Sequence, residues 1–255
     1  MDEIRVCSKE DLKQVLDWLK AENAAGLPGC FYCNRSLIKE SFKKKNVWIL
    51  DLGKGPIAFL VLNPLCSSIE ILEVKHAERG HGYGRKMAEF AISYFKSKNH
   101  SIIRIDCQPS SSINFWKKMG FHLYKETFKG VSKKNHYSNR AYLKIGKDNY
   151  VDPSWPMVSV EIRFYPEQVK WNDKSVEPIV VFKPDCFRKS SNELVLKDRI
   201  VFYHPSVFEA RDVVICISVE DNKLYMDKAK YEEGKIFGIN KQDNDLFWLD
   251  RILIP

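Results

Sequence analysis

The sequence predicts an α/β protein of two domains: an α+β domain with a mixed sheet flanked by helices, then a smaller all-β barrel or sandwich. Three observations predict this class. Over residues 1–146, strand-like apolar runs alternate with segments of helical period. After residue 157 only short runs rich in Val, Ile, Phe and Tyr remain, separated by Asn, Asp, Gly and Pro. A length of 255 residues suits two domains. We therefore place a linker at residues 147–157 and the all-β domain at residues 158–255.

The first domain opens with a strand at residues 4–7 and a helix. Ser8 and Asp11 form the pattern of a capping box, and apolar residues then recur at helical spacing. The Gly26–Gly29 segment, with Pro28 inside it, interrupts the chain. The elements expected next are a helix from Asn34 to about Lys44, strands at 47–52, 57–62 and 68–74, a helix after Gly84, a strand at 102–107, a short helix near 111–119, and strands at 121–127 and 141–145.

The helix after Gly84 has the strongest amphipathic pattern in the chain. Its apolar side chains fall on one face, at positions i, i+3, i+4, i+7 and i+8, namely Met87, Phe90, Ala91, Tyr94 and Phe95. In the second domain, strands are expected at 158–164, 179–182, 194–203, 213–219, 223–226, 236–239 and 247–253. No segment of comparable helical period accompanies them, which favours an all-β domain.

Residues 69–84 combine a strand, a glycine-rich loop and the start of a helix. Glycines adopt positive φ without a steric penalty, and successive backbone N–H groups can then surround an anion. The positive end of the following helix adds to the attraction. A glycine-rich turn is also common as a plain tight loop, so the spacing has to decide between the two interpretations.

The spacing excludes two common phosphate-binding motifs. A dinucleotide-binding G-x-G-x-x-G starting at Gly80 would need a third glycine where Arg85 stands, and a P-loop fails at the same position. The spacing that remains is Arg79-x-x-Gly82-x-Gly84, just beyond an apolar strand.

This pattern resembles the acyl-CoA-binding motif R/Q-x-x-G-x-G/A of the GNAT superfamily of N-acetyltransferases. Leu72-Glu73-Val74 resembles that family's strand ending in valine, and Asn114 to Phe121 resembles its short helix-plus-strand signature. The two motifs span residues 69–121, and the order of elements matches over about residues 1–146.

The resemblance implies transfer of an acetyl group from acetyl-CoA, as cosubstrate, to an amine. It implies that the pyrophosphate binds backbone N–H groups near residues 80–85 and that the pantetheine arm pairs with the strand edge at Leu72–Val74. The N–H of Val74 would polarise the thioester carbonyl. The residues expected to contact the cosubstrate are Leu72, Val74, Arg79, Gly80, His81, Gly82, Tyr83, Gly84 and Arg85.

A carboxylate on the same strand is the expected general base, because an amine is protonated near neutral pH and must lose a proton. Strand alternation places Glu70 on the face of Leu72 and Val74, where some members of the family carry their base, and Glu73 is the second choice. Trp116 occupies the position of the family's thiolate-protonating tyrosine, and an indole N–H cannot serve as that acid. Tyr124 is the substitute we expect, unless the thiolate leaves unassisted.

The acceptor stays open at this point between a small amine, a protein amine and an aminoacyl-tRNA. The missing tyrosine keeps a second function open, a non-catalytic acyl-CoA-binding module that regulates or supports the β domain.

Charge is distributed unevenly between the halves. Residues 1–150 carry 26 Lys and Arg against 15 Asp and Glu, and the remainder carries 15 against 18. A lysine-rich solvated surface that attracts an anionic cosubstrate explains the basic half, and RNA is the alternative partner.

The seven cysteines and the absence of a long apolar run favour a cytoplasmic protein without a membrane partner. Cys30 and Cys33 form a lone C-x-x-C, but a zinc site needs further ligands that no second pair supplies. We therefore expect two buried thiols and no metal.

Overall fold

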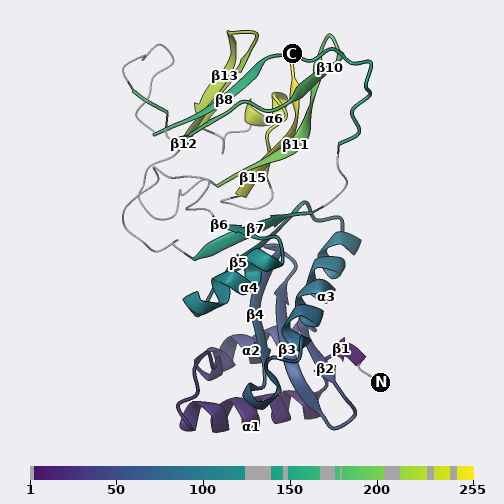
Figure 1. The fold of residues 1–255 in the computed structure, drawn as a ribbon, viewed down its shortest axis with the longest axis vertical. Helices are drawn as coiled ribbons and strands as arrows, with labels where there is room; N and C mark the ends of the chain where they lie inside the picture. The colour runs from purple at the N-terminus through teal and green to yellow at the C-terminus, as the bar shows by residue number, and fades with distance from the viewer. Residues whose placement is uncertain are drawn as a thin grey trace. The chain divides into compact units, whose positions relative to one another are not determined.

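The computed structural model describes residues 3–123, 139–145, 149–166, 176–178, 180–203, 213–228, 233–241 and 246–255. These residues fall into two compact units (Figure 1). The first contains residues 3–123 and 139–145, and the second contains the described residues from 149 onward.

The first unit combines a sheet with helices on both sides. Its strands are β1 (Glu3–Val6), β2 (Val47–Asp51), β3 (Pro56–Asn63), β4 (Ser68–Val74), β5 (Ile102–Asp106), β6 (His122–Leu123) and β7 (Arg140–Lys144). Its helices are α1 (Lys9–Ala24), α2 (Arg35–Lys43), α3 (Tyr83–Ser97) and α4 (Ile113–Lys118), with 3-10 turns η1 (Tyr32–Asn34), η2 (His76–Glu78) and η3 (Ser110–Ser112).

The seven strands lie in the order β1-β2-β3-β4-β5-β7-β6. Neighbours are antiparallel except β4 and β5, which run parallel. Helix α3 makes the crossover that a parallel pair requires. The mixed sheet flanked by helices is therefore the predicted one.

Alternation along the strands divides the apolar side chains between two cores. On one face Leu50, Leu60 and Leu62 pack with Met87 and Phe95 of α3. On the other face the intervening residues Ile49, Phe59 and Val61 pack with Val15 and Leu19 of α1 and Ile38 of α2. Burial of each such side chain contributes about 1.5–3 kcal/mol, so both helical layers are held to the sheet mainly by apolar contact.

The start of α1 follows the predicted capping box. Ser8 Oγ accepts from the N–H of Asp11, and the Asp11 carboxylate accepts from the N–H of Ser8. The start of α2 differs, because Asn34 precedes Arg35 without a side-chain capping bond. Turn η1 leads directly into α2, so that helix begins from a helical turn instead of a capped extended residue.

The second unit contains two antiparallel four-stranded sheets, β10-β11-β15-β14 and β13-β12-β8-β9. The strands are β8 (Val160–Pro166), β9 (Val180–Phe182), β10 (Cys186–Ser190), β11 (Glu193–Tyr203), β12 (Val213–Val219), β13 (Asn222–Lys228), β14 (Asn240–Lys241) and β15 (Leu246–Leu253), with one helical turn, α6 (Glu233–Ile236). The rings of Phe164 on β8 and Phe202 on β11 join the sheets, with centroids 5.0 Å apart. Among the described residues no strand pairing closes the sheets into a barrel, so that part of the prediction is not met.

The strand predictions in this unit need correction, and the short strand β14 was also not predicted. The strand expected at 236–239 is wrong: Ile236 ends α6, and Gly238 has φ of 92° in the turn that follows. Strand β10 was not predicted, because Arg188, Lys189 and Ser190 interrupt its apolar pattern. It forms nonetheless because it pairs with β11.

No helix in the described part of the chain has the length and apolar character needed to cross a membrane.

Candidate functional site

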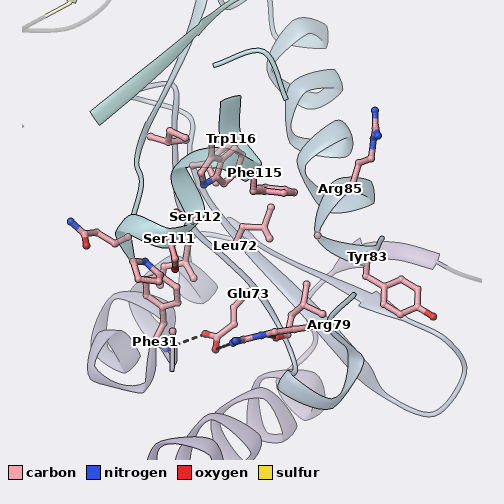
Figure 2. A pocket seen from close by; sticks show the side chains of 18 of the residues that line it. Phe31, Leu72, Glu73, Arg79, Tyr83, Arg85, Ser111, Ser112, Phe115 and Trp116 are labelled. Carbon is pink, nitrogen blue, oxygen red and sulfur yellow. Dashed lines mark hydrogen bonds and ion pairs between the residues drawn. The ribbon is translucent and has the colours of Figure 1, made fainter. Parts of the chain in front are cut away.

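A cavity of about 540 Å³ lies in the first unit (Figure 2). Its walls come from β4, the glycine loop with the start of α3, the segment before η1, and the chain from the end of β5 into α4. Most residues that the sequence analysis selected line this one cavity.

Strands β4 and β5 separate at the cavity. Their pairing covers only Ser68 with Arg104 and Ile69 with Ile105. The rest of β4 stays paired with β3 on its other side, out to Val74 opposite Ala58. Within the described residues, Leu72 to Val74 therefore have no strand partner on the side of β5.

Hydrogen-bond alternation shows which backbone groups the open edge exposes. The N–H of Lys75 donates to the carbonyl of Ile57 at 2.8 Å. Because antiparallel pairs alternate, Glu73 and Ile71 direct their backbone groups toward β3, and Leu72 and Val74 direct theirs toward the gap. An extended ligand in the gap could add to the edge as a strand does.

A β-bulge at Glu70 changes the alternation of β4. The register with β3 shifts between Val61 opposite Ile71 and Leu62 opposite Ile69, which leaves Glu70 unpaired. Ile69 consequently lies on the same face as Leu72, in the core beneath α3. Glu70 is exposed, lines the cavity, and accepts a hydrogen bond from Ser68 Oγ.

The glycine loop has the backbone geometry expected of an anion cradle. Gly80 and Gly82 have φ of 88° and 84°, which favours glycine. Gly82 is the N-cap of α3, and no side chain caps the helix. The first helical N–H groups, from Tyr83 to Arg85, are therefore available to a ligand at the positive end of the helix.

Arg79 is the motif residue whose side chain the protein itself holds. Its Nε donates to the carbonyl of Val74 at 3.0 Å, and its Nη1 donates to the carbonyl of Pro28 at 3.0 Å. Its Nη2 lies 3.7 Å from Oε1 of Glu73, an ion-pair distance too long for a hydrogen bond. Arg79 thus fastens the glycine loop to β4 and to the segment that follows α1.

Glu73 lines the cavity, and its side chain lies between Phe31 and Arg79 (Figure 2). Its side chain is 2% exposed, and Oε2 accepts from the N–H of Phe31 at 3.1 Å. Burial raises the pKa of Glu73 to about 7, and the negative charge of Glu22 adds to the rise while Phe31 N–H and Arg79 oppose it.

The short helix α4 supplies an aromatic wall. Trp116 is 7% exposed and makes edge contacts with Phe115 at 4.9 Å and Phe121 at 5.1 Å between centroids. It therefore acts as a core residue at the position where the resemblance implies a tyrosine. Ser112 also lines the cavity, and its buried Oγ has no hydrogen-bond partner among the residues that the structure describes.

Of the residues expected to contact the cosubstrate, eight line the cavity: Leu72, Val74, Arg79, Gly80, Gly82, Tyr83, Gly84 and Arg85. His81 does not, and its Nδ1 lies 3.2 Å from the carbonyl oxygen of Glu78. The side chain of Arg85 is 70% exposed and pairs with Glu89 at 3.0 Å, and its backbone lies in the first turn of α3. Tyr124 lies outside the described residues.

Pro28, Gly29 and Phe31 form a wall of the cavity that was not expected from the sequence. Gly29 has φ of 75°, and a Cβ there would lie 3.7 Å from Pro109 and 3.8 Å from the Arg79 guanidinium. The proline and glycines after the first helix were visible in the sequence as a break. Their approach to Arg79 depends on tertiary contacts.

Residues 12–121 match the model of the acetyltransferase (GNAT) family. Similar solved structures include Ard1 from Thermoplasma volcanium, with 16% identity over 57% of this chain and 99% of that chain and a TM-score of 0.44. The ribosomal-protein-S18-alanine N-acetyltransferase of Escherichia coli has 12% identity over 59% of this chain and 100% of that chain, with a TM-score of 0.43. N-acetylglutamate synthase from Neisseria gonorrhoeae, complexed with coenzyme A and N-acetyl-glutamate, has 13% identity over 58% of this chain and 36% of that chain, with a TM-score of 0.43. No curated protein sequence matches significantly.

Proposed function

Because residues 12–121 form an acetyltransferase domain of the GNAT family, we propose that this chain is an acetyl-CoA-dependent N-acetyltransferase. One observation carries the proposal: the open edge of β4 and the uncapped start of α3 line the same cavity. The two features match the two ends of the cosubstrate. Helix N–H groups suit the pyrophosphate, and strand-edge groups suit the amide-bearing pantetheine arm.

The binding energy is sufficient for a cosubstrate. Hydrogen bonds to a charged partner contribute roughly 1.5–3 kcal/mol each, and micromolar affinity needs about 8 kcal/mol. A few N–H groups from Gly80 to Arg85, together with the edge at Leu72 and Val74, reach that range. The N–H of Val74 would also polarise the thioester carbonyl.

Glu70 is our proposed general base. A base has to reach its proton by hydrogen-bond geometry before its pKa matters. Glu70 is exposed on the cavity wall, whereas the carboxylate of Glu73 is buried and already accepts from Phe31. The amine nitrogen bonds to the acetyl carbon, the carbon–sulfur bond breaks, and the amine proton passes to Glu70 directly or through water.

The leaving sulfur departs as a thiolate. Trp116 cannot protonate it, so the proton comes from solvent or from Tyr124, our proposed acid. Conversion of Tyr124 to Phe distinguishes the two: it lowers kcat if Tyr124 is the acid and leaves kcat unchanged if solvent supplies the proton.

Thiol release from acetyl-CoA, measured against small amines, peptide amines and aminoacyl-tRNA, tests the proposal. Glu70→Gln should lower kcat about 10²–10⁴-fold at unchanged CoA affinity. The matched control is Glu89→Gln, an exposed carboxylate on α3 outside the cavity, which should retain full activity. Full activity in Glu70→Gln would remove Glu70 from the mechanism.

The core position of Trp116 also favours a second function, an acyl-CoA-binding module without turnover. Tight CoA binding by calorimetry, with no thiol release for any acceptor, would establish it in place of the enzyme. RNA affinity that falls steeply with salt would favour aminoacyl-tRNA as the acceptor.

All seven cysteines are free thiols. We propose a cytoplasmic location on this basis, because reducing compartments keep thiols unpaired.

A further inference from the structure

Cys30, the first cysteine of the C-x-x-C motif, lies beside two carboxylates, one eight residues earlier in the chain and one on β4. Glu22 comes from the end of α1 and Glu73 from β4. One potential ligand atom from each of the three residues lies within 4.8 Å of the others. The further metal ligands that the sequence did not reveal for Cys30 are therefore carboxylates and not a second pair of cysteines.

Each carboxylate is buried and only half satisfied. Glu22 is 8% exposed, and its Oε1 accepts from the N–H of His76 at 2.7 Å. Glu73 is 3% exposed, and its Oε2 accepts from the N–H of Phe31. Among the described residues, the second oxygen of each, Oε2 of Glu22 and Oε1 of Glu73, is buried without a hydrogen-bond partner. The Arg79 guanidinium lies 3.7 Å from Oε1 of Glu73, beyond hydrogen-bond distance. Buried carboxylates normally have hydrogen-bond partners or ligate a metal, so the pair points to a further cation.

The local charges indicate a divalent cation. Once metal binding displaces the Cys30 proton, two carboxylates and the Cys30 thiolate would carry three negative charges, and the Arg79 guanidinium, 3.7 Å from Glu73, carries one positive charge. A divalent ion makes the cluster neutral. The thiol selects against Mg²⁺ and Ca²⁺, which prefer oxygen ligands, and favours Zn²⁺.

We propose that Glu22, Cys30 and Glu73 bind a zinc-class divalent cation. Zinc bonds of about 2.0–2.3 Å in a tetrahedron separate ligand atoms by roughly 3.3–3.8 Å, so side-chain rotations within the 4.8 Å cluster bring them into position. Cys30 Sγ now donates to the carbonyl of Leu19 at 3.3 Å and would exchange that bond for the metal. The ion ties the segment carrying Phe31 to β4 at the wall of the cavity.

Three protein ligands leave a fourth position on zinc. Glu73 lines the cavity, so a water or a ligand group in the cavity can take that position. Cys33, the other cysteine of the motif, is exposed, and its Sγ lies 3.0 Å from Oδ1 of Asn34. Cys33 is therefore not a ligand. The expectation of two buried thiols is wrong, because Cys33 is exposed and Cys30 is only partly buried.

Co²⁺ titration of the full chain after chelator treatment tests the site. We expect one Co²⁺ per chain and a near-ultraviolet thiolate-to-cobalt absorption band that added Zn²⁺ removes. Cys30→Ser should lose the band and weaken Zn²⁺ binding at least about tenfold. Cys33→Ser is the matched control in the same motif and should keep the absorption band and the natural affinity for Zn²⁺. Loss of the band in both variants, or in neither, would overturn the assignment.

Thermal melting gives a second readout if Cys30→Ser folds poorly. Zn²⁺ should raise the Tm of the natural chain and of Cys33→Ser, and it should leave that of Glu22→Gln unchanged. A natural chain that binds neither Co²⁺ nor Zn²⁺ would contradict the proposal.

Discussion

Arg79 donates a hydrogen bond from Nε to the carbonyl oxygen of Val74, at 3.0 Å. The arginine of the glycine motif therefore holds the last residue of β4, the one whose N–H faces the cavity. Its Nη1 holds Pro28 in the same way. In the proposed site, recognition of the cosubstrate would thus depend on backbone groups that Arg79 positions.

Replacement of Arg79 by Ala should destabilise the first unit by about 1–3 kcal/mol. The substitution removes two hydrogen bonds that the charged guanidinium donates. Because the Arg79 side chain is 35% exposed, solvent screening keeps the loss of stability below the value for two buried hydrogen bonds. A Tm lower by a few degrees, with weaker CoA binding by calorimetry, is expected. Arg85→Ala removes only an exposed pair with Glu89 and should change stability by less than about 0.5 kcal/mol. Equal effects of the two variants would contradict the positioning role.

Gly82→Ala should weaken CoA binding beyond its effect on stability. Gly82 has φ of 84° and open space around its Cβ position, so backbone strain of about 1–2 kcal/mol is the only folding penalty. Gly53→Ala is the matched control, because Gly53 has φ of 86° and equally open space but lies in the turn between β2 and β3. Both variants should lose similar stability in urea unfolding, and only Gly82→Ala should lose CoA affinity. A CoA affinity that is retained in Gly82→Ala would remove the glycine loop from the binding site.

Substitutions of Gly84 should separate stability from binding. A Cβ there would lie 3.7 Å from Val74, 3.8 Å from Phe115 and 3.9 Å from Leu72, in ordinary contact. Gly84→Ala should therefore stabilise α3 by about 0.4–1 kcal/mol. Gly84→Leu projects further into the cavity and should abolish CoA binding, as calorimetry can measure. If the leucine variant folds and binds CoA normally, the cavity does not hold the cosubstrate.

The pair of Arg5 and Asp11 should make stability depend on acid pH. The hydrogen bonds that the Asp11 carboxylate accepts from Arg5 lower the pKa of Asp11 to about 2, below the value near 3.9 expected in the unfolded chain. A depressed folded pKa means that the contribution is complete above about pH 4 and is lost as pH falls toward 2. Asp11→Asn should cost about 1.5–3 kcal/mol at pH 7 and much less near pH 2, by urea unfolding. Asp17→Asn, at an exposed position of α1, is the control and should change stability by less than about 0.5 kcal/mol.

The faces of β4 show where prediction from sequence succeeds and where it ends. Period two correctly places Leu72 apart from Ile71, and the two residues lie in different cores. The same rule places Ile69 with Ile71, but the bulge at Glu70 moves Ile69 to the face of Leu72. A bulge depends on the register with the neighbouring strand, which alternation within one strand cannot reveal.

The sequence by itself determined the mixed sheet with flanking helices, the glycine loop and its spacing, because these depend on local periodicity and on glycine's backbone freedom. Only the tertiary structure decided what surrounds the loop. The separation of β4 from β5 leaves an open edge on β4, and the Arg79 side chain donates to the carbonyls of Val74 and Pro28. Contact between Glu22, Cys30 and Glu73 joins three segments through the packing of α1 on the sheet. Contacts between distant segments leave no periodic trace in a sequence, so chemistry that depends on them appears only after folding.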